Sequence, residues 1–165
     1  MLKKKFYLVF YLAAIIFILF FTLNGNKFYT IKEKDIENKN KISLEKENFN
    51  NYSLKLKEDI NYNKLYVYKS KNDEFYVFIY SKSIFFDRYN LDDDFMTKDK
   101  SINRVASNYK FKNFINIDLE KDPLKIDVKS EKNEDRKNTL IKYFVVVVLI
   151  AFLGYRRNNR ENLKK

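Results

Sequence analysis

The chain has 165 residues, enough for one domain or for one domain with tethering segments. It combines 45% hydrophobic residues with 33% charged residues and a formal net charge of +11. The sequence contains no Cys and no His, which excludes disulfides, thiolate metal sites, thiol nucleophiles and histidine bases. Two Gly and one Pro exclude collagen-like and Gly-rich phosphate-binding classes.

Residues 6–23 are predicted to form a transmembrane helix that follows a basic cytoplasmic segment at residues 1–5. These 18 residues carry no charge and would span about 27 Å as a helix, close to the roughly 30 Å hydrocarbon core of a bilayer. A cleaved signal peptide is the alternative, because three Lys precede the apolar run. The run exceeds the about 7–15 apolar residues of a signal peptide, and residues 22–26 lack a small-x-small cleavage site. We therefore favour an uncleaved signal anchor.

Residues 24–51 are rich in Lys, Glu and Asn. Apolar residues are too sparse in this stretch to show a helical or a strand period. The composition predicts a polar stalk, with a loosely packed first strand at residues 27–32 as the alternative.

Residues 52–129 have the pattern of a β-rich domain. Apolar and polar residues alternate over residues 52–57, as in a half-buried strand. Two β-branched and aromatic runs, residues 64–70 and 74–81, flank the turn-forming residues 71–73. This arrangement predicts a β-hairpin.

The second half of this domain is less regular. Residues 83–89 predict a further strand or a turn, and residues 91–108 a loop with a short helix near 99–107. Alternation returns over residues 109–119 and 124–129, which the single proline separates. Five or six strands and one helix are enough for a small antiparallel sheet with a helix packed on it, or for a small sandwich.

Residues 139–155 form the second predicted transmembrane helix, between a charged linker at 130–138 and a basic tail at 156–165. These 17 residues would span about 26 Å as a helix. Both flanks are basic, so the positive-inside rule places both termini in the cytoplasm and the central domain outside. The topology-determining residues of this prediction are Lys3, Lys4, Lys5, Arg156, Arg157 and Arg160.

The predicted fold class is a membrane protein in which two transmembrane α-helices flank a small extracytoplasmic β-rich domain, either α+β or all-β and antiparallel. The predicted location is the bacterial cytoplasmic (inner) membrane. The two basic flanks carry +7 of the +11 net charge, so the charge indicates topology rather than a nucleic-acid interface.

Asp92, Asp93 and Asp94, with Asp99 nearby, are the most concentrated set of side chains that could bind a metal ion. Carboxylate oxygens are the ligands that Ca²⁺ prefers, which makes the four residues a weak calcium candidate. The spacing lacks the Gly and the terminal Glu of an EF-hand loop. We favour a solvated acidic loop that caps a following helix.

The aromatic residues of the predicted hairpin are a candidate binding face, because aromatic side chains are enriched at protein interfaces. Aromatic residues also fill small β-cores, and AT-rich codon usage raises the content of Tyr and Phe. The core interpretation is therefore favoured. The residues of the candidate face are Tyr66, Tyr68, Tyr76, Phe78 and Tyr80.

No motif identifies a reaction, and we expect neither a catalytic residue nor a cofactor. The leading hypothesis is a non-catalytic membrane-anchored envelope protein whose outer domain binds a protein partner or envelope ligand, as an accessory subunit or assembly factor. The expected partners are the lipid bilayer and a membrane or envelope protein, or a second copy, without nucleic acid. The alternatives are a sensor that relays an external signal to the basic tail, and an envelope hydrolase that uses Asp87, Asp92 and Asp118.

Overall fold

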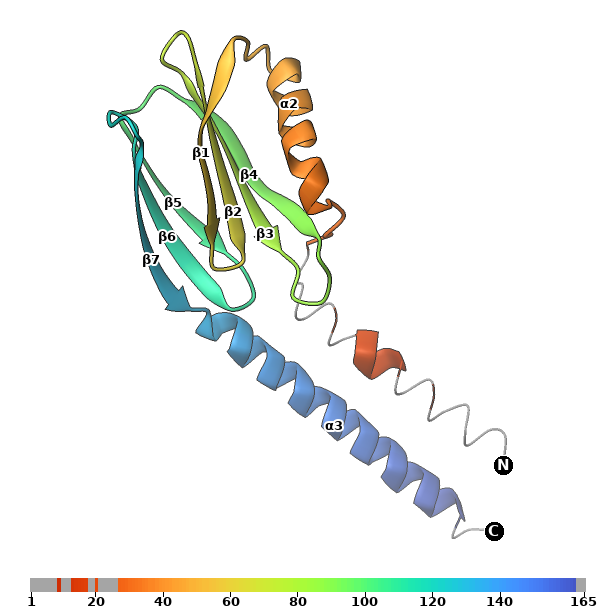
Figure 1. The fold of residues 1–165 in the computed structure, drawn as a ribbon. Helices are drawn as coiled ribbons and strands as arrows, with labels where there is room; N and C mark the ends of the chain where they lie inside the picture. The colour runs from red at the N-terminus through yellow and green to blue at the C-terminus, as the bar shows by residue number, and fades with distance from the viewer. Residues whose placement is uncertain (1–8, 10–12, 18–19, 21–26, 163–165) are drawn as a thin grey trace. The chain divides into compact units, whose positions relative to one another are not determined.

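The computed structural model describes residues 9, 13–17, 20 and 27–162 (Figure 1). The chain divides into two compact units, and each is described by itself. One unit is Lys27–Asn133, and the other combines Met1–Asn26 with Glu134–Lys165. The first unit contains both β-sheets.

The larger sheet has four antiparallel strands that follow one another in chain order. Its central hairpin confirms the prediction from residues 64–70 and 74–81, with Tyr66 opposite Phe78 in the register. The preceding hairpin has a two-residue turn, since Ile60 pairs with Asn63. The strands are β1 (Tyr52–Ile60), β2 (Asn63–Ser70), β3 (Phe75–Lys82) and β4 (Tyr89–Thr97).

The smaller sheet has three antiparallel strands, β5 (Ser101–Ser107), β6 (Phe111–Asp118) and β7 (Lys125–Lys132). The two sheets pack face to face around one apolar core. Strands β2 and β3 are buried on both faces, as their unbroken apolar and aromatic runs predict. The buried core between the sheets includes Leu65, Val67, Val77, Ile79, Ile102, Ala106, Ile115 and Ile117.

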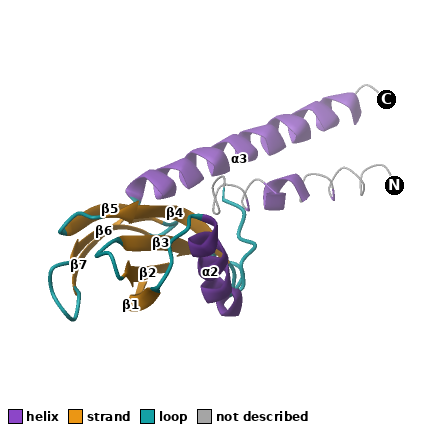
Figure 2. Cartoon of the chain, turned by 90° about the horizontal axis from the view of Figure 1, so that it is seen from above, coloured by secondary structure: helices purple, strands orange, loops and turns teal. Residues whose placement is uncertain are grey.

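A short helix covers the other face of the larger sheet, which gives three layers: helix, sheet and sheet (Figures 1 and 2). The 3₁₀ turn η1 (Glu33–Asp35) leads into α2 (Ile36–Lys46). Ile36, Asn40 and Leu44 are the buried residues of α2, and their i, i+4 spacing places them on one side of the helix. The remaining side chains of α2 are polar or exposed.

Two predictions about the strand-bearing unit are wrong. The polar stalk expected over residues 24–51 is wrong, because α2 lies within them; only every fourth residue of α2 is buried, so its composition stays polar. Where a first strand at residues 27–32 was the alternative, the structure has an isolated β-bridge between Ile31 and Tyr89. Residues 91–108 are not a loop with a short helix but strands β4 and β5. In β5, Arg104 takes an inward register position and reaches Asp93 across the sheets at 3.5 Å, which disguises the alternation.

The helix α3 (Glu134–Asn162) has 29 residues and contains the predicted second span. Within the described residues, no helix is both long enough and apolar enough to cross a membrane. The prediction of a two-pass protein of the bacterial cytoplasmic membrane, with an extracytoplasmic central domain, is therefore wrong. The uncharged run of α3 has 13 residues, about 20 Å of helix against a roughly 30 Å hydrocarbon core.

The other topology residues are distributed as follows. Most of residues 6–23, the first predicted span, lie outside the described residues, as do Lys3, Lys4 and Lys5. Arg156, Arg157 and Arg160 fall within the last turns of α3.

Candidate functional site

The five aromatic residues of the candidate binding face lie beneath α2. Each is at most 6% exposed, and all belong to the core cluster that includes Ile36 and Leu44 of α2. Asn40 of α2 forms hydrogen bonds with two of these residues. The Tyr80 hydroxyl donates to Asn40 Oδ1 at 2.5 Å, and Asn40 Nδ2 donates to the Tyr68 hydroxyl at 3.2 Å. Burial raises the pKa of both phenols. In this structure, α2 occupies the face that a partner would need.

The three consecutive aspartates of β4 do not converge. Asp92 binds Lys27 Nζ at 2.7 Å, whereas Asp93 lies 3.5 Å from Arg104 and Asp94 accepts a hydrogen bond from the Tyr76 hydroxyl at 3.1 Å. Strand alternation sends Asp93 and Asp94 to opposite faces of the sheet. No group of three or more metal-ligating side chains forms within the described ranges. Asp99 lies in the turn after β4, where its N–H donates to Thr97.

The carboxylates proposed for a hydrolase are also apart. Asp87, in the loop after β3, pairs with Lys82 at 2.8 Å, and Asp118, at the end of β6, pairs with Lys121 at 3.1 Å. These positions lie at opposite ends of the sandwich, as the strand register shows. In each case the hydrogen bond from the lysine lowers the pKa of the carboxyl, so both stay ionised at neutral pH and neither can act as a general acid.

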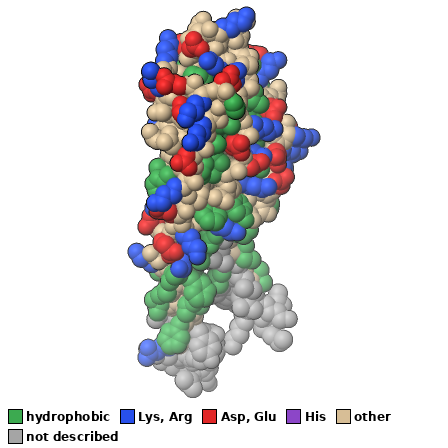
Figure 3. Space-filling view, turned by 60° about the vertical axis from the view of Figure 1, so that its left-hand side comes forward, with side chains coloured by type: hydrophobic (Ala, Val, Ile, Leu, Met, Phe, Trp, Pro, Cys, Tyr) green, Lys and Arg blue, Asp and Glu red, His purple; other side chains and the backbone are tan. Residues whose placement is uncertain are grey.

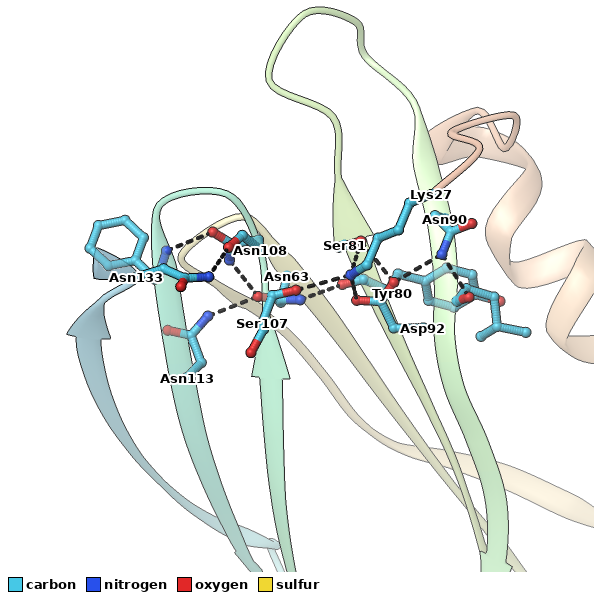
Figure 4. Close-up of polar contacts among 12 residues, drawn as sticks. Lys27, Asn63, Tyr80, Ser81, Asn90, Asp92, Ser107, Asn108, Asn113 and Asn133 are labelled. Atoms are coloured by element: carbon cyan, nitrogen blue, oxygen red, sulfur yellow. Dashed lines mark hydrogen bonds and ion pairs between the residues drawn. The ribbon is translucent and has the colours of Figure 1, made fainter. Parts of the chain in front are cut away.

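Four buried asparagines join the two sheets at the end where the β1–β2 turn lies; we call Asn63, Asn108, Asn113 and Asn133 the amide cluster (Figure 4). Asn63 Oδ1 accepts hydrogen bonds from Asn108 Nδ2 at 2.6 Å and from Asn113 Nδ2 at 2.8 Å. Asn63 Nδ2 donates to the backbone oxygen of Tyr80, and Asn133 Nδ2 donates to that of Asn108. Carboxamides do not titrate, so the cluster supplies register and rigidity rather than acid–base chemistry.

The first and last residues of the strand-bearing unit meet the same segment of chain. Lys27 Nζ donates to the backbone oxygen of Ser107 at 3.0 Å and also binds Asp92 (Figure 4). At the other terminus, the N–H of Asn133 donates to the backbone oxygen of Lys110 at 2.9 Å. Residues 107–110 therefore hold both points where the chain enters and leaves this unit.

A charged cleft lies on the helix side of the larger sheet, at the same end as the amide cluster. We call it the Lys64 cleft; its volume is about 310 Å³. It gathers side chains from η1, from the β1–β2 hairpin, from the end of β3 and from the start of β4. The lining residues are Glu33, Asp59, Tyr62, Asn63, Lys64, Lys82 and Tyr89.

Lys64 lies at the base of the cleft, and its side chain is 6% exposed. Its ammonium lies 2.8 Å from Glu33 and 2.7 Å from Asp59. Burial lowers the pKa of Lys64, but the hydrogen bonds to Asp59 and Glu33 outweigh burial and raise it overall. Lys64 is therefore a fixed positive charge near neutral pH. The carboxylates above it are far more open, because the Glu33 side chain is 49% exposed and that of Asp59 is 71% exposed.

Tyr89 forms the wall of the cleft between two lysines. Lys64 Nζ and Lys82 Nζ each lie 5.6 Å from the centroid of its ring, a distance at which a cation is attracted to an aromatic face. The Tyr89 hydroxyl also donates to Glu33 at 3.4 Å. These contacts tie β4 to η1 and keep the cleft in shape.

A second hollow, of about 270 Å³, lies at the opposite end of the sandwich. It is formed by the segment after α2 and by the β2–β3 turn, with Asn48, Asn51 and Asn72 among its lining residues. Asn48 and Asn51 have φ of 56° and 54°, a backbone conformation that Asn adopts readily in turns. The polar groups of this second hollow come mostly from turn residues. The Lys64 cleft is therefore the stronger candidate for a binding site.

The edges of the sheets are protected against pairing with another strand. β1 and β4 each carry a register irregularity, at Lys55 and at Asp92. β7 presents alternating charges, including Lys125 and Glu131. Lys, Arg, Asp and Glu side chains are interspersed over the face seen in Figure 3. These features disfavour the addition of another strand at β1, β4 and β7.

Comparison with known proteins gives no relative: no protein-family model, curated protein or solved structure matches the chain. The Lys64 cleft was not predicted from the sequence. One signal was present, because Lys64 stands at the first of three alternating positions whose other members, Tyr66 and Tyr68, are buried. A lysine on a buried face needs a carboxylate partner, but strand alternation does not show which one.

Proposed function

We propose that the chain is a non-catalytic binding protein whose strand-bearing unit engages a protein partner at the Lys64 cleft, in the role of an accessory subunit or assembly factor. The observation that carries the proposal is the convergence of Glu33, Asp59 and a buried Lys64 in an open hollow of about 310 Å³. A hollow with a few converging polar groups and aromatic walls is the usual form of a recognition site.

The ionisation states in the cleft favour binding over catalysis. General acids and bases work best when their pKa lies near the operating pH. Ion pairing moves the two lysines of the cleft away from neutrality, since the pKa of Lys64 is raised overall despite its burial and the hydrogen bond to Asp87 raises the pKa of Lys82. Fixed charges of this kind supply orientation and specificity to a contact with another protein.

Site-directed crosslinking in the cells that produce the chain tests the proposal. The sequence has no Cys, so one introduced Cys carries a photocrosslinker at a single position. Asp87→Cys places the probe beside the cleft, next to Lys82, whereas Asp127→Cys places it on exposed β7 as the matched control. We expect a defined adduct from position 87 and none from position 127. Equal adducts from both positions, or none from position 87, would refute the proposal.

A second candidate function is a regulator in which binding at the cleft is relayed to the segments outside the strand-bearing unit. It is favoured by the contacts of residues 107–110, which hold Lys27 and Asn133 and also reach the cleft through Lys110, whose Nζ donates to the Tyr62 hydroxyl at 2.8 Å. In such a regulator the cleft and Asn133 are coupled sites, and coupling between sites is reciprocal. A change in the cleft therefore alters the conformation or the exchange rate at Asn133.

Hydrogen exchange tests this relay. Tyr62→Gly removes the contact with Lys110, and we expect faster exchange at Asn133 and in the first turn of α3. Tyr52→Ala, at the start of β1, is the control and should leave those amides unchanged. Unchanged exchange at Asn133 in Tyr62→Gly would exclude the relay.

A further inference from the structure

We propose that two cations, Lys27 and Arg104, close the free edge of β5 against pairing with a strand of a second copy of the chain. Neither residue lines the Lys64 cleft, so this role is separate from the proposed function. Three observations carry it: the direction of the backbone groups of β5, the side-chain donors that reach two of them, and the aspartates that hold these donors.

β5 is an edge strand of the smaller sheet, and the direction of its free backbone groups follows from its ladder with β6. The N–H of Leu119 donates to the backbone oxygen of Lys100, and the N–H of Asn108 donates to that of Phe111. These two pairs bracket a continuous register, so the even-numbered residues of β5 are the ones that bond to β6. The backbone groups of the odd-numbered residues therefore point to the free edge, at positions 101, 103, 105 and 107.

The backbone of β5 has the features of an edge that accepts another strand. The other three edges of the described sheets carry a register irregularity or alternating charges, whereas the register of β5 is continuous over residues 101–107. Ser101, Asn103 and Val105 are all exposed. A continuous, exposed edge is a template for pairing between chains, so β5 needs another form of protection.

Side-chain donors occupy two of the carbonyl oxygens that face this edge. Lys27 Nζ donates to the backbone oxygen of Ser107 at 3.0 Å (Figure 4), and Arg104 Nη1 donates to that of Asn103 at 3.2 Å. An added antiparallel strand needs these oxygens as acceptors for its own N–H groups. The two cations therefore compete with an incoming strand, and a second copy would bring the same positive charges to the edge.

Two neighbouring aspartates of β4 hold the two cations in place. Asp92 lies 2.7 Å from Lys27 Nζ, and Asp93 lies 3.5 Å from Arg104 Nε. Consecutive residues of a regular strand point to opposite faces, but Asp92 is the extra residue of a β-bulge, which re-aims side chains. The ring of Phe95 adds a contact 4.2 Å from the guanidinium carbon of Arg104. The acidic run that resembled a weak calcium site thus orients the cations that cover β5.

A second copy is the partner that this arrangement excludes. Antiparallel pairing of two β5 strands about a twofold axis at Asn103 places Ser101 of one copy opposite Val105 of the other. All three residues direct their backbone groups to the edge, so the edge is complementary to itself. In this register Arg104 stands opposite Ile102 of the other copy, so no two like charges are directly opposed once Lys27 and Arg104 are replaced.

The decisive variant is Lys27→Met/Arg104→Met, which removes both donors and keeps much of each side-chain stem. Its matched control is Lys41→Met/Lys121→Met, which lowers the net charge of +11 equally, at two lysines that are 65% and 55% exposed. Sedimentation velocity of the full-length chain measures self-association. We expect the variant to self-associate about tenfold more strongly than the native chain, and the control to match the native chain.

Val105→Pro tests whether the association uses the edge of β5. The N–H of Val105 faces away from β6, so proline removes a donor from the edge and leaves the ladder with β6 in place. Added to Lys27→Met/Arg104→Met, it should return self-association to the native level. Aggregation of misfolded chains would not depend on this one N–H.

Arg104→Met alone covers the case in which the loss of Lys27 unfolds the chain. The side chains of Arg104 and Asp93 are 46% and 48% exposed, so the loss of their pair should leave the unfolding midpoint nearly unchanged. We expect about threefold stronger self-association, again reversed by Val105→Pro. Self-association no stronger than that of the control, or association that persists after Val105→Pro, would overturn the proposal.

Discussion

The amide cluster and the Lys64 cleft lie at the same end of the sandwich, on opposite faces of the larger sheet, and Asn63 belongs to both. In the cluster, neutral carboxamides are buried between the sheets and bind one another. In the cleft, full charges are arranged from a covered lysine to open carboxylates. Both sites are polar, yet one is closed and largely hydrogen-bonded, with Asn133 Oδ1 as its buried atom that lacks a partner among the described residues, while the other is open and only partly neutralised.

This difference indicates which polar residues stabilise the fold and which are available to bind a ligand. A closed network of neutral groups stabilises one arrangement, because any loss leaves a buried group without a partner. An open set of charges can lose a partner to water at little cost, which leaves it free to exchange that partner for a ligand. We therefore expect substitutions in the cluster to reduce stability and substitutions in the cleft to reduce binding.

The largest effect is expected in the amide cluster. Asn113→Ala removes the hydrogen bonds to Asn63 and to the backbone of Ile60, and it leaves Ser130 without its acceptor. We expect a loss of about 3 kcal/mol in the free energy of unfolding, measured by urea denaturation. Asn116→Ala, on the exposed face of the same strand, is the control and should change stability by about 0.5 kcal/mol or less.

A smaller loss is expected where α2 is locked to the sheet. Asn40→Ala leaves the hydroxyls of Tyr68 and Tyr80 buried without their partner, which should cost about 2 kcal/mol in urea unfolding. Asn38→Ala, on the exposed side of α2, gains the same helix propensity without losing a buried contact. If the two variants are equally stable, the contact with Asn40 does not hold the helix.

Lys64→Met should cost less than either asparagine substitution. The ammonium is buried, but Glu33 and Asp59 are open enough to be hydrated when it is lost, so we expect about 1 kcal/mol. Lys57→Met, which breaks the more exposed pair with Glu37, should change stability by about 0.5 kcal/mol or less. If Lys64→Met lowers the free energy of unfolding as much as Asn113→Ala does, the cleft and the cluster do not differ in their contribution to stability.

The smallest effect concerns alkaline pH. Burial, and then Asp94, raises the pKa of Tyr76 from its ordinary value of 10.0 to about 12, with Glu47 acting in the same direction. The stabilising contribution of the neutral phenol is complete below pH 10 and is lost as the pH rises through 12. Tyr76→Phe should therefore flatten the fall in urea midpoint over this interval. An unchanged slope would mean that the Tyr76 phenol does not contribute.

Local sequence pattern predicted the hairpin of β2 and β3 well, because aromatic and β-branched residues on both faces leave few alternatives to a central strand. It failed for α2, where three buried residues in an otherwise polar segment give a weak signal. It failed again for β5, where Arg104 interrupts the apolar alternation and is satisfied by a different strand.

The candidate site was beyond the reach of local pattern for a different reason. Glu33, Lys64 and Tyr89 come from three separate elements, and their convergence depends on how η1 packs against the end of the larger sheet. The aromatic face was identified as a set of residues, but the sequence does not show that α2 covers it. Burial of a surface by a distant segment is a tertiary property.

Photocrosslinking from position 87, with position 127 as the control, tests the central claim most directly. We expect a defined adduct from Asp87→Cys, beside the Lys64 cleft, and none from Asp127→Cys on exposed β7. Equal adducts from both positions, or no adduct from position 87, would contradict the assignment of recognition to the Lys64 cleft.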